Sequence, residues 1–138
     1  MSGVALPSRP ARWALRAVAL FAGLFGAATI VAAGNALFGQ PAGGDAEAIV
    51  PFVVWFNFGA GFFYIAAAFG LALARRWSIT LALALAATTA AVFTIFGLYV
   101  AAGGAFQTRT VYALGLRTIV WVAIALVAAW LLRRRPQA

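Results

Sequence analysis

The sequence predicts an all-α integral membrane protein, an up-down bundle of four transmembrane helices in a single domain over residues 1–138. The chain is 66% hydrophobic and only 9% charged, whereas soluble domains carry about 25% charged residues. It contains four apolar runs of 22–25 residues, and about 20 residues cross a hydrocarbon core of roughly 30 Å. Because the connections between the runs are short, consecutive helices should be antiparallel neighbours.

The expected helices cover residues 14–38, 51–74, 79–102 and 111–132. The first contains a 17-residue apolar stretch, longer than the apolar part of a signal peptide, so we expect it to stay in the membrane. The second starts at Pro51, and proline suits the first turn of a helix. The third follows a tight turn at 75–78, and the fourth follows a small loop at 103–110.

The arginines predict the orientation of the bundle. The net charge of +8 comes from ten arginines and two acids. An even number of crossings places eight of the arginines on one side of the membrane, namely Arg9, Arg12, Arg16, Arg75, Arg76, Arg133, Arg134 and Arg135. The positive-inside rule then predicts that both termini are cytoplasmic. Since these arginines flank apolar runs, we expect them to set topology and not to bind nucleic acid.

The composition excludes most catalytic and cofactor chemistry. The chain has no cysteine and no histidine, and its only carboxylates are Asp45 and Glu47, two residues apart in the first loop. Haem, iron–sulfur, zinc and copper sites depend on thiolate or imidazole ligands. A proton-driven pump needs a titratable group in the membrane, and arginine does not titrate usefully. We therefore expect no enzymatic activity and no cofactor.

Arg117 is the most informative single residue. It lies six residues inside the last apolar run, and none of the four runs contains an acid. A guanidinium in hydrocarbon costs roughly 2.5–3.5 kcal/mol, so something should offset that cost. Asn57 lies six residues inside the second run, at the same depth of about 9 Å. We expect an outer-facing polar pocket here, and its candidate ligand-binding residues are Arg117, Asn57, Asn35, Tyr99, Arg109, Asp45 and Glu47.

Three interpretations of these polar residues stay open. They can form a hydrogen-bonded cluster that holds the helices together. Arg117 can extend towards the lipid headgroups instead. Alternatively, the residues can form a real site for a ligand or a partner, with Asp45 and Glu47 folding over it and neutralising a cation.

Helical spacing adds three further predictions. One face of the second helix should carry Asn57, Gly61, Tyr64 and Ala68. One face of the fourth helix should carry Arg117, Trp121, Ile124 and Ala128. Small residues should let helices approach closely, and the candidates are Gly59, Gly61, Gly23 and Ala27. The hydroxyls of Thr88, Thr89 and Thr94 should bond to preceding carbonyls of their own helix.

Two segments resemble a small bacterial family of uncharacterised four-helix inner-membrane proteins. One is Pro51–Phe52–Val53–Val54–Trp55–Phe56–Asn57–Phe58 with Gly61, Phe62 and Tyr64, and the other contains Arg109, Thr110, Val111, Arg117, Thr118 and Trp121. The resemblance implies a multi-pass protein of the bacterial inner (cytoplasmic) membrane and no particular activity. The layout is also similar to that of DoxX-like four-helix proteins.

Two functions fit these observations. We first expect a non-enzymatic accessory, structural or assembly subunit that docks against a larger membrane partner, or against copies of itself, through small-residue helix faces. The alternative is a small binding or transport module whose pocket around Arg117 holds an anion, a lipid headgroup or a quinone. In that case the phenylalanines of the second helix could line an apolar slot. Membrane lipid is the expected partner in both cases.

Overall fold

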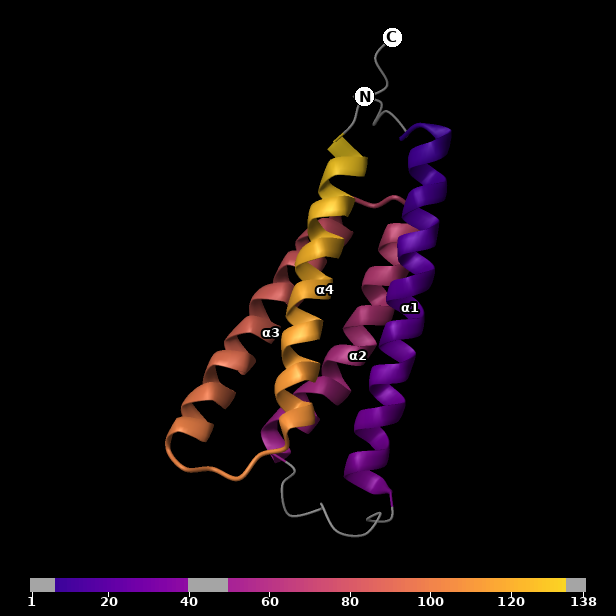
Figure 1. Ribbon diagram of the computed structural model, residues 1–138. Coiled ribbons are helices and arrows are strands. Elements are labelled where there is room, and N and C mark those ends of the chain that lie inside the picture. Colours follow the sequence, from indigo (N-terminus) through magenta and orange to yellow (C-terminus); the bar gives the residue numbers. More distant parts are fainter. Residues whose placement is uncertain (1–6, 40–49, 134–138) are drawn as a thin grey trace.

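The structure is a computed structural model that describes residues 7–39 and 50–133, and these form four α-helices (Figure 1). The helices are α1 (Arg9–Phe38), α2 (Pro51–Ala72), α3 (Trp77–Ala101) and α4 (Thr108–Arg133). Each is long and apolar enough to cross a membrane. The prediction of an all-α chain with four such helices is therefore confirmed.

Three of the helices, α1, α3 and α4, begin before their apolar runs. α1 begins at Arg9 instead of residue 14 because Ser8 caps it, its Oγ accepting a hydrogen bond from the Ala11 N–H at 3.4 Å. α3 and α4 begin at Trp77 and Thr108 instead of residues 79 and 111. Polar residues are compatible with a helical backbone, so an apolar run marks the part that can cross lipid and not the whole helix.

α2 is shorter than expected, ending at Ala72 instead of residue 74. The backbone of Ala74 adopts the left-handed conformation, with φ of 53°, which ends the helix. The Arg75 N–H then donates to the Gly70 carbonyl at 2.8 Å. The tight turn therefore covers residues 73–76, two residues earlier than the sequence predicted.

This turn gives a first testable prediction. Left-handed backbone costs a residue with a Cβ roughly 1–2 kcal/mol, so Ala74→Gly should raise the free energy of unfolding by about 0.5–1 kcal/mol, the gain being reduced by glycine's greater freedom in the unfolded chain. A titration with sodium dodecyl sulfate from mild detergent micelles measures it. Ala102→Gly is the control, because Ala102 caps the C-terminal end of α3 with φ of −80°. This substitution should not raise the free energy of unfolding. Destabilisation by Ala74→Gly would contradict this account.

The helices pack as a ring in which each contacts the next. α1 and α2 make the most extensive contact, followed by α3 with α4, α2 with α3 and, least of all, α1 with α4. Figure 1 shows the chain descending α1 and α3 and ascending α2 and α4. This order leaves α2 and α4 on a diagonal of the ring, facing each other across the interior.

α1 and α2 approach most closely where Gly26 faces Gly61. A Cβ added to Gly26 would lie 2.9 Å from the Cβ of Tyr64 and 3.0 Å from the carbonyl oxygen of Gly61. A Cβ added to Gly61 would lie 3.2 Å from the carbonyl oxygen of Gly26. These distances leave no room for a side chain, so the two backbones touch, as small residues permit in membrane helix pairs.

The prediction of close approach is thus confirmed for Gly61 but wrong for Gly59. Nothing lies within 4 Å of a Cβ added to Gly59, because that residue faces outwards. Gly23 makes an ordinary contact, its added Cβ lying 3.7 Å from the Cβ of Ala68. Gly26, the partner of Gly61, was not predicted.

Two apolar clusters fill the interior at different levels. The larger contains residues of all four helices, mostly alanine and leucine, with Tyr64 and Trp121 among them. The smaller, called here the small apolar cluster, consists of Val50, Val53, Phe96 and Leu114. It lies where the N-terminal end of α2 meets the C-terminal half of α3 and the first turns of α4.

Candidate functional site

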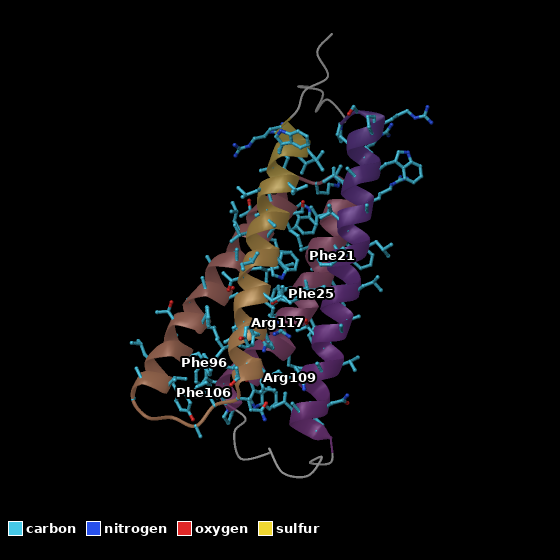
Figure 2. All side chains as sticks on the ribbon, viewed as in Figure 1. Phe21, Phe25, Phe96, Phe106, Arg109 and Arg117 are labelled. Carbon is cyan, nitrogen blue, oxygen red and sulfur yellow. The ribbon has the colours of Figure 1, made fainter. Side chains whose placement is uncertain are left out.

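Arg117 lies in the part of the bundle that the sequence indicated, but deeper along its helix. Because α4 begins at Thr108, Arg117 is nine residues from the helix start, or about 13.5 Å at 1.5 Å per residue. Helical side chains lean towards the N-terminus of their helix. This brings the guanidinium towards the level of Asn57, about 9 Å from the start of α2. Both residues are partly buried, and Figure 2 shows Arg117 along α4 above Arg109.

Four buried polar atoms in the described part of the chain have no hydrogen-bond partner. They are Asn57 Oδ1, the Tyr64 hydroxyl oxygen, Arg117 Nε and Trp121 Nε1. We call these four residues the interior polar cluster. Asn57 and Tyr64 are seven residues apart on α2, and Arg117 and Trp121 are four apart on α4, so each pair shares one face of its helix. The cluster therefore spans the α2–α4 diagonal.

An unpartnered cluster of this kind is energetically costly. A buried polar group without a partner costs about 1–3 kcal/mol, and a charged one costs more. Folded proteins keep such groups rare, and each instance calls for an explanation. Asn57 and Arg117 were both predicted to belong to one polar pocket, but neither Asn57 Oδ1 nor Arg117 Nε has the hydrogen bond that a cluster holding the helices together would provide.

Tyr64 and Trp121 form the inner end of the cluster. Each lies 13 residues from the start of its helix, and each side chain is 0% exposed. Their ring centroids are 4.7 Å apart with planes inclined by 38°, so the two rings bridge the diagonal. Phe25 of α1 stacks on Tyr64, with centroids 5.8 Å apart. The Tyr64 hydroxyl lies near Arg117, and the aromatic pair lies deeper in the bundle than Arg117, which is nine residues from the start of α4.

The predicted threonine bonds are confirmed. Thr88, Thr89 and Thr94 donate to the carbonyls of Ala84, Leu85 and Ala90 at 2.8, 2.6 and 2.9 Å. Thr89 is fully buried beside Tyr64, but its proton is committed to its own helix. Its hydroxyl is therefore no donor for Asn57 or Tyr64.

The other predicted site residues are placed differently. Asn35 is exposed near the end of α1, and Arg109 is exposed in the first turn of α4. Tyr99 is 36% exposed, and its hydroxyl donates to the Ala105 carbonyl at 3.1 Å, which holds the α3–α4 connection. Asp45 and Glu47 lie outside the described residues. Of the seven predicted residues, the interior polar cluster contains Arg117 and Asn57.

The sequence interpretation missed Tyr64 and Trp121 as members of the site. Both were placed correctly on the stripes of Asn57 and Arg117, and the buried positions of Tyr64, Ala68, Trp121 and Ala128 confirm those stripes. The signal that was available is the polar atom each ring carries, because buried Tyr O–H and Trp N–H groups usually find a partner.

The charge and donor set of the cluster define the chemistry it can perform. Arg117 is a fixed cation, and no helix in the described ranges contains an acid, since the only acids of the chain are residues 45 and 47. Arg117 Nε and Trp121 Nε1 are donors only, whereas the Tyr64 hydroxyl and the Asn57 amide can donate or accept. Several donors around a cation fit the oxygens of a carboxylate or a phosphate, which form strong charge-assisted hydrogen bonds with guanidinium.

Two apolar grooves run along the outside of the helix ring. The α1–α4 groove has a volume of about 320 Å³ and is lined by Ala17, Val18, Phe21, Ala123, Ile124 and Val127. The α2–α3 groove has a volume of about 390 Å³ and is lined by Trp55, Phe56, Gly59, Ala60, Phe63, Leu81, Ala84, Leu85 and Thr88. Two phenylalanines of α2, Phe56 and Phe63, thus do line an apolar groove.

Comparison of the chain with known proteins gave no match to a family model, to a curated protein or to a solved structure. The resemblance to bacterial four-helix inner-membrane proteins therefore stays an expectation from the sequence. Because function resides in sites and not in folds, the proposal below depends on the chemistry of the interior polar cluster.

Proposed function

We propose that the protein is a multi-pass membrane protein without enzymatic activity that binds the anionic group of a ligand at Arg117. The interior polar cluster carries this proposal. A ligand oxyanion would neutralise the guanidinium and accept hydrogen bonds from Arg117 Nε and Trp121 Nε1. Binding would thereby offset the cost of burying these groups without partners. Purely structural glue is less favoured, because neither Asn57 Oδ1 nor Arg117 Nε bonds to another group of the protein.

The orientation proposed from the sequence fits this function. We propose an up-down four-helix bundle in the bacterial inner membrane, with both termini in the cytoplasm. In support, the arginines at the start of α1, in the turn after α2 and at the end of α4 occupy three places that Figure 1 shows towards one end of the bundle. The positive-inside rule places that end in the cytoplasm. The guanidinium of Arg117 then faces the non-cytoplasmic half of the membrane.

Replacement of Arg117 tests the proposal. Arg117→Gln should weaken the binding of an anionic probe by at least about tenfold, or about 1.4 kcal/mol, because the charge and the Nε donor are both lost. The stability of the protein without ligand should stay the same or rise, because the variant removes a cation that no neighbour neutralises. Native mass spectrometry with phosphatidylglycerol, phosphatidylcholine and soluble glycerol phosphate measures the binding, and detergent unfolding measures the stability.

The matched control is Arg109→Gln, which removes an exposed arginine from the first turn of the same helix. It should leave binding of all three probes within about twofold of the original protein. The proposal fails if the original protein binds no anionic probe and Arg117→Gln lowers its stability. That outcome would identify the cluster as structural.

Asp45 and Glu47 are the alternative source of negative charge for Arg117. If they neutralised it, the double variant Asp45→Asn, Glu47→Gln would lower stability, and it would bind the anionic probe more tightly than the original protein. We expect instead that the double variant keeps the stability and the probe affinity of the original protein. The comparison separates an internal counter-charge from a ligand.

Docking against a membrane partner is the second candidate function. Gly59, Gly97 and Gly115 lie on three different helices, and nothing lies within 4 Å of a Cβ added to any of them. Another helix can approach closely at such positions. The same native mass spectra decide this candidate, because they report the copy number and any retained protein. A mass equal to one chain with lipid alone would count against it.

A further inference from the structure

We infer that the ligand of Arg117 is an anionic lipid and that one of its hydrocarbon chains lies in the α1–α4 groove. This inference rests on the proposed function and adds the class of ligand and the position of its apolar part. The headgroup carboxylate or phosphate would meet Arg117, and the chain would continue from there along the outside of α4.

The groove lies further along α4 than the polar site, and its lining residues on α4 begin at Ala123, six residues after Arg117. Ile124 and Val127 line the groove and follow Arg117 by seven and ten residues, which places all three on one face of the helix. The distance along the axis from Arg117 to Val127 is about 15 Å. An extended molecule with a charged end and an apolar remainder matches a polar site at Arg117 that is followed along α4 by an apolar groove.

Aromatic side chains connect the groove to the interior polar cluster. Phe21 lines the groove, and its ring stacks on that of Phe25 with centroids 5.9 Å apart. Phe25 stacks in turn on Tyr64, which lies deeper in the bundle than Arg117. Figure 2 shows Phe21, Phe25 and Arg117 at successive levels along the bundle. The groove and the site therefore share a continuous apolar wall.

The α2–α3 groove lacks such a connection. Towards the start of α2, the small apolar cluster closes the same side of the bundle, and its member Leu114 is fully buried one turn before Arg117. A chain in the α2–α3 groove would thus be separated from the guanidinium by packed side chains.

A lipid is the class of ligand that satisfies both parts of the arrangement. A free phosphate or carboxylate would satisfy Arg117 but leave the groove without an occupant. A neutral quinone would fill the groove but leave the cation without a counter-charge. α1 and α4 make the least extensive contact of the four neighbouring pairs, so the groove opens sideways, and a lipid can enter it from the bilayer.

Filling the groove tests this inference. Ala123 is an exposed groove residue, so Ala123→Leu adds bulk to the groove without entering the core. Its binding of phosphatidylglycerol, measured by native mass spectrometry, should fall at least about fivefold, while its binding of glycerol phosphate stays unchanged. Ala17→Leu on the opposite wall should do the same, which guards against a local folding defect in either variant. Arg117→Gln should lower the binding of both probes.

Two control variants carry the same kind of added bulk elsewhere. Ala87→Leu changes an exposed residue of α3 that lines neither groove, and Gly59→Leu fills the α2–α3 groove. Both should keep phosphatidylglycerol binding within about twofold of the original protein. If Gly59→Leu abolished binding and the α1–α4 groove variants did not, the inference would be overturned in favour of the other groove.

The design separates this inference from the proposed function. If Ala123→Leu and Ala17→Leu bind phosphatidylglycerol as the original protein does, while Arg117→Gln does not, the chain position is wrong and anion binding at Arg117 stands. If Arg117→Gln binds both probes as the original protein does, the proposed function and this inference fail together.

Discussion

Gly26→Ala should destabilise the protein, although alanine is the better helix former. The new Cβ would lie 3.0 Å from the Gly61 carbonyl oxygen and 2.9 Å from the Tyr64 Cβ. Backbone atoms cannot rotate away, so the added Cβ would force α1 and α2 apart. These two helices form the most extensive contact in the bundle. Overpacking costs about 1–3 kcal/mol, against a gain of up to about 1 kcal/mol in helix propensity. Detergent unfolding followed by circular dichroism measures the net loss.

Gly97→Ala is the matched control for this substitution. Gly97 lies within α3, and nothing lies within 4 Å of its added Cβ, so that variant should gain the propensity term alone. Both variants gain the same propensity term, so they should differ by the overpacking cost of about 1–3 kcal/mol. Equal stabilities would show that α1 and α2 do not cross at Gly26. Gly61→Ala should behave as Gly26→Ala does, because it faces the same crossing.

Trp121→Ala is the second substitution with a large expected effect. The ring is fully buried on the α2–α4 diagonal against Tyr64, and replacing a buried tryptophan by alanine costs about 3–5 kcal/mol. The loss removes the contact that bridges the two diagonal helices, so we expect the variant to unfold at lower detergent concentration. Trp13→Ala, at an exposed position of α1, should change stability by about 0.5 kcal/mol or less.

Trp121→Phe distinguishes the packing of the ring from its polar atom. Phenylalanine keeps an aromatic ring in place but lacks the N–H that has no partner in the structure. Removing an unpartnered buried donor recovers part of its desolvation cost of about 1–3 kcal/mol, which offsets the smaller ring. The stability should therefore stay within about 1 kcal/mol of the original. A loss as large as that of Trp121→Ala would show that the N–H has a partner after all.

The sequence predicted the spans well because a hydrocarbon core demands long apolar runs whatever the packing. It predicted helix ends less well, since these depend on local chemistry. The Ser8 cap extends α1 into a basic segment, and the left-handed backbone of Ala74 ends α2 early. Neither feature changes hydropathy, so neither could be seen in the apolar pattern.

The site was only partly predictable for a related reason. Depth along a helix can be counted, which identified Arg117 and Asn57. Which helices face each other cannot be counted, and the α2–α4 diagonal is what brings Tyr64 and Trp121 together. Tyr99 has a suitable depth, but its hydroxyl bonds to the Ala105 carbonyl of the connection after α3. Loop geometry of this kind is not encoded in periodicity.

The unequal lengths of α1 and α2 make bilayer thickness a variable for this protein. α1 has 30 residues and α2 has 22, or about 45 and 33 Å at 1.5 Å per residue, against a hydrocarbon core of roughly 30 Å. The length of α2 exceeds the hydrocarbon thickness only slightly, so a thicker membrane would outgrow α2 first. The longer α1 would adjust to the same change by altering its tilt. Since the two backbones touch at one crossing, a tilt of α1 must turn the pair as a unit. Lipid composition would thus set the inclination of this helix pair in the membrane.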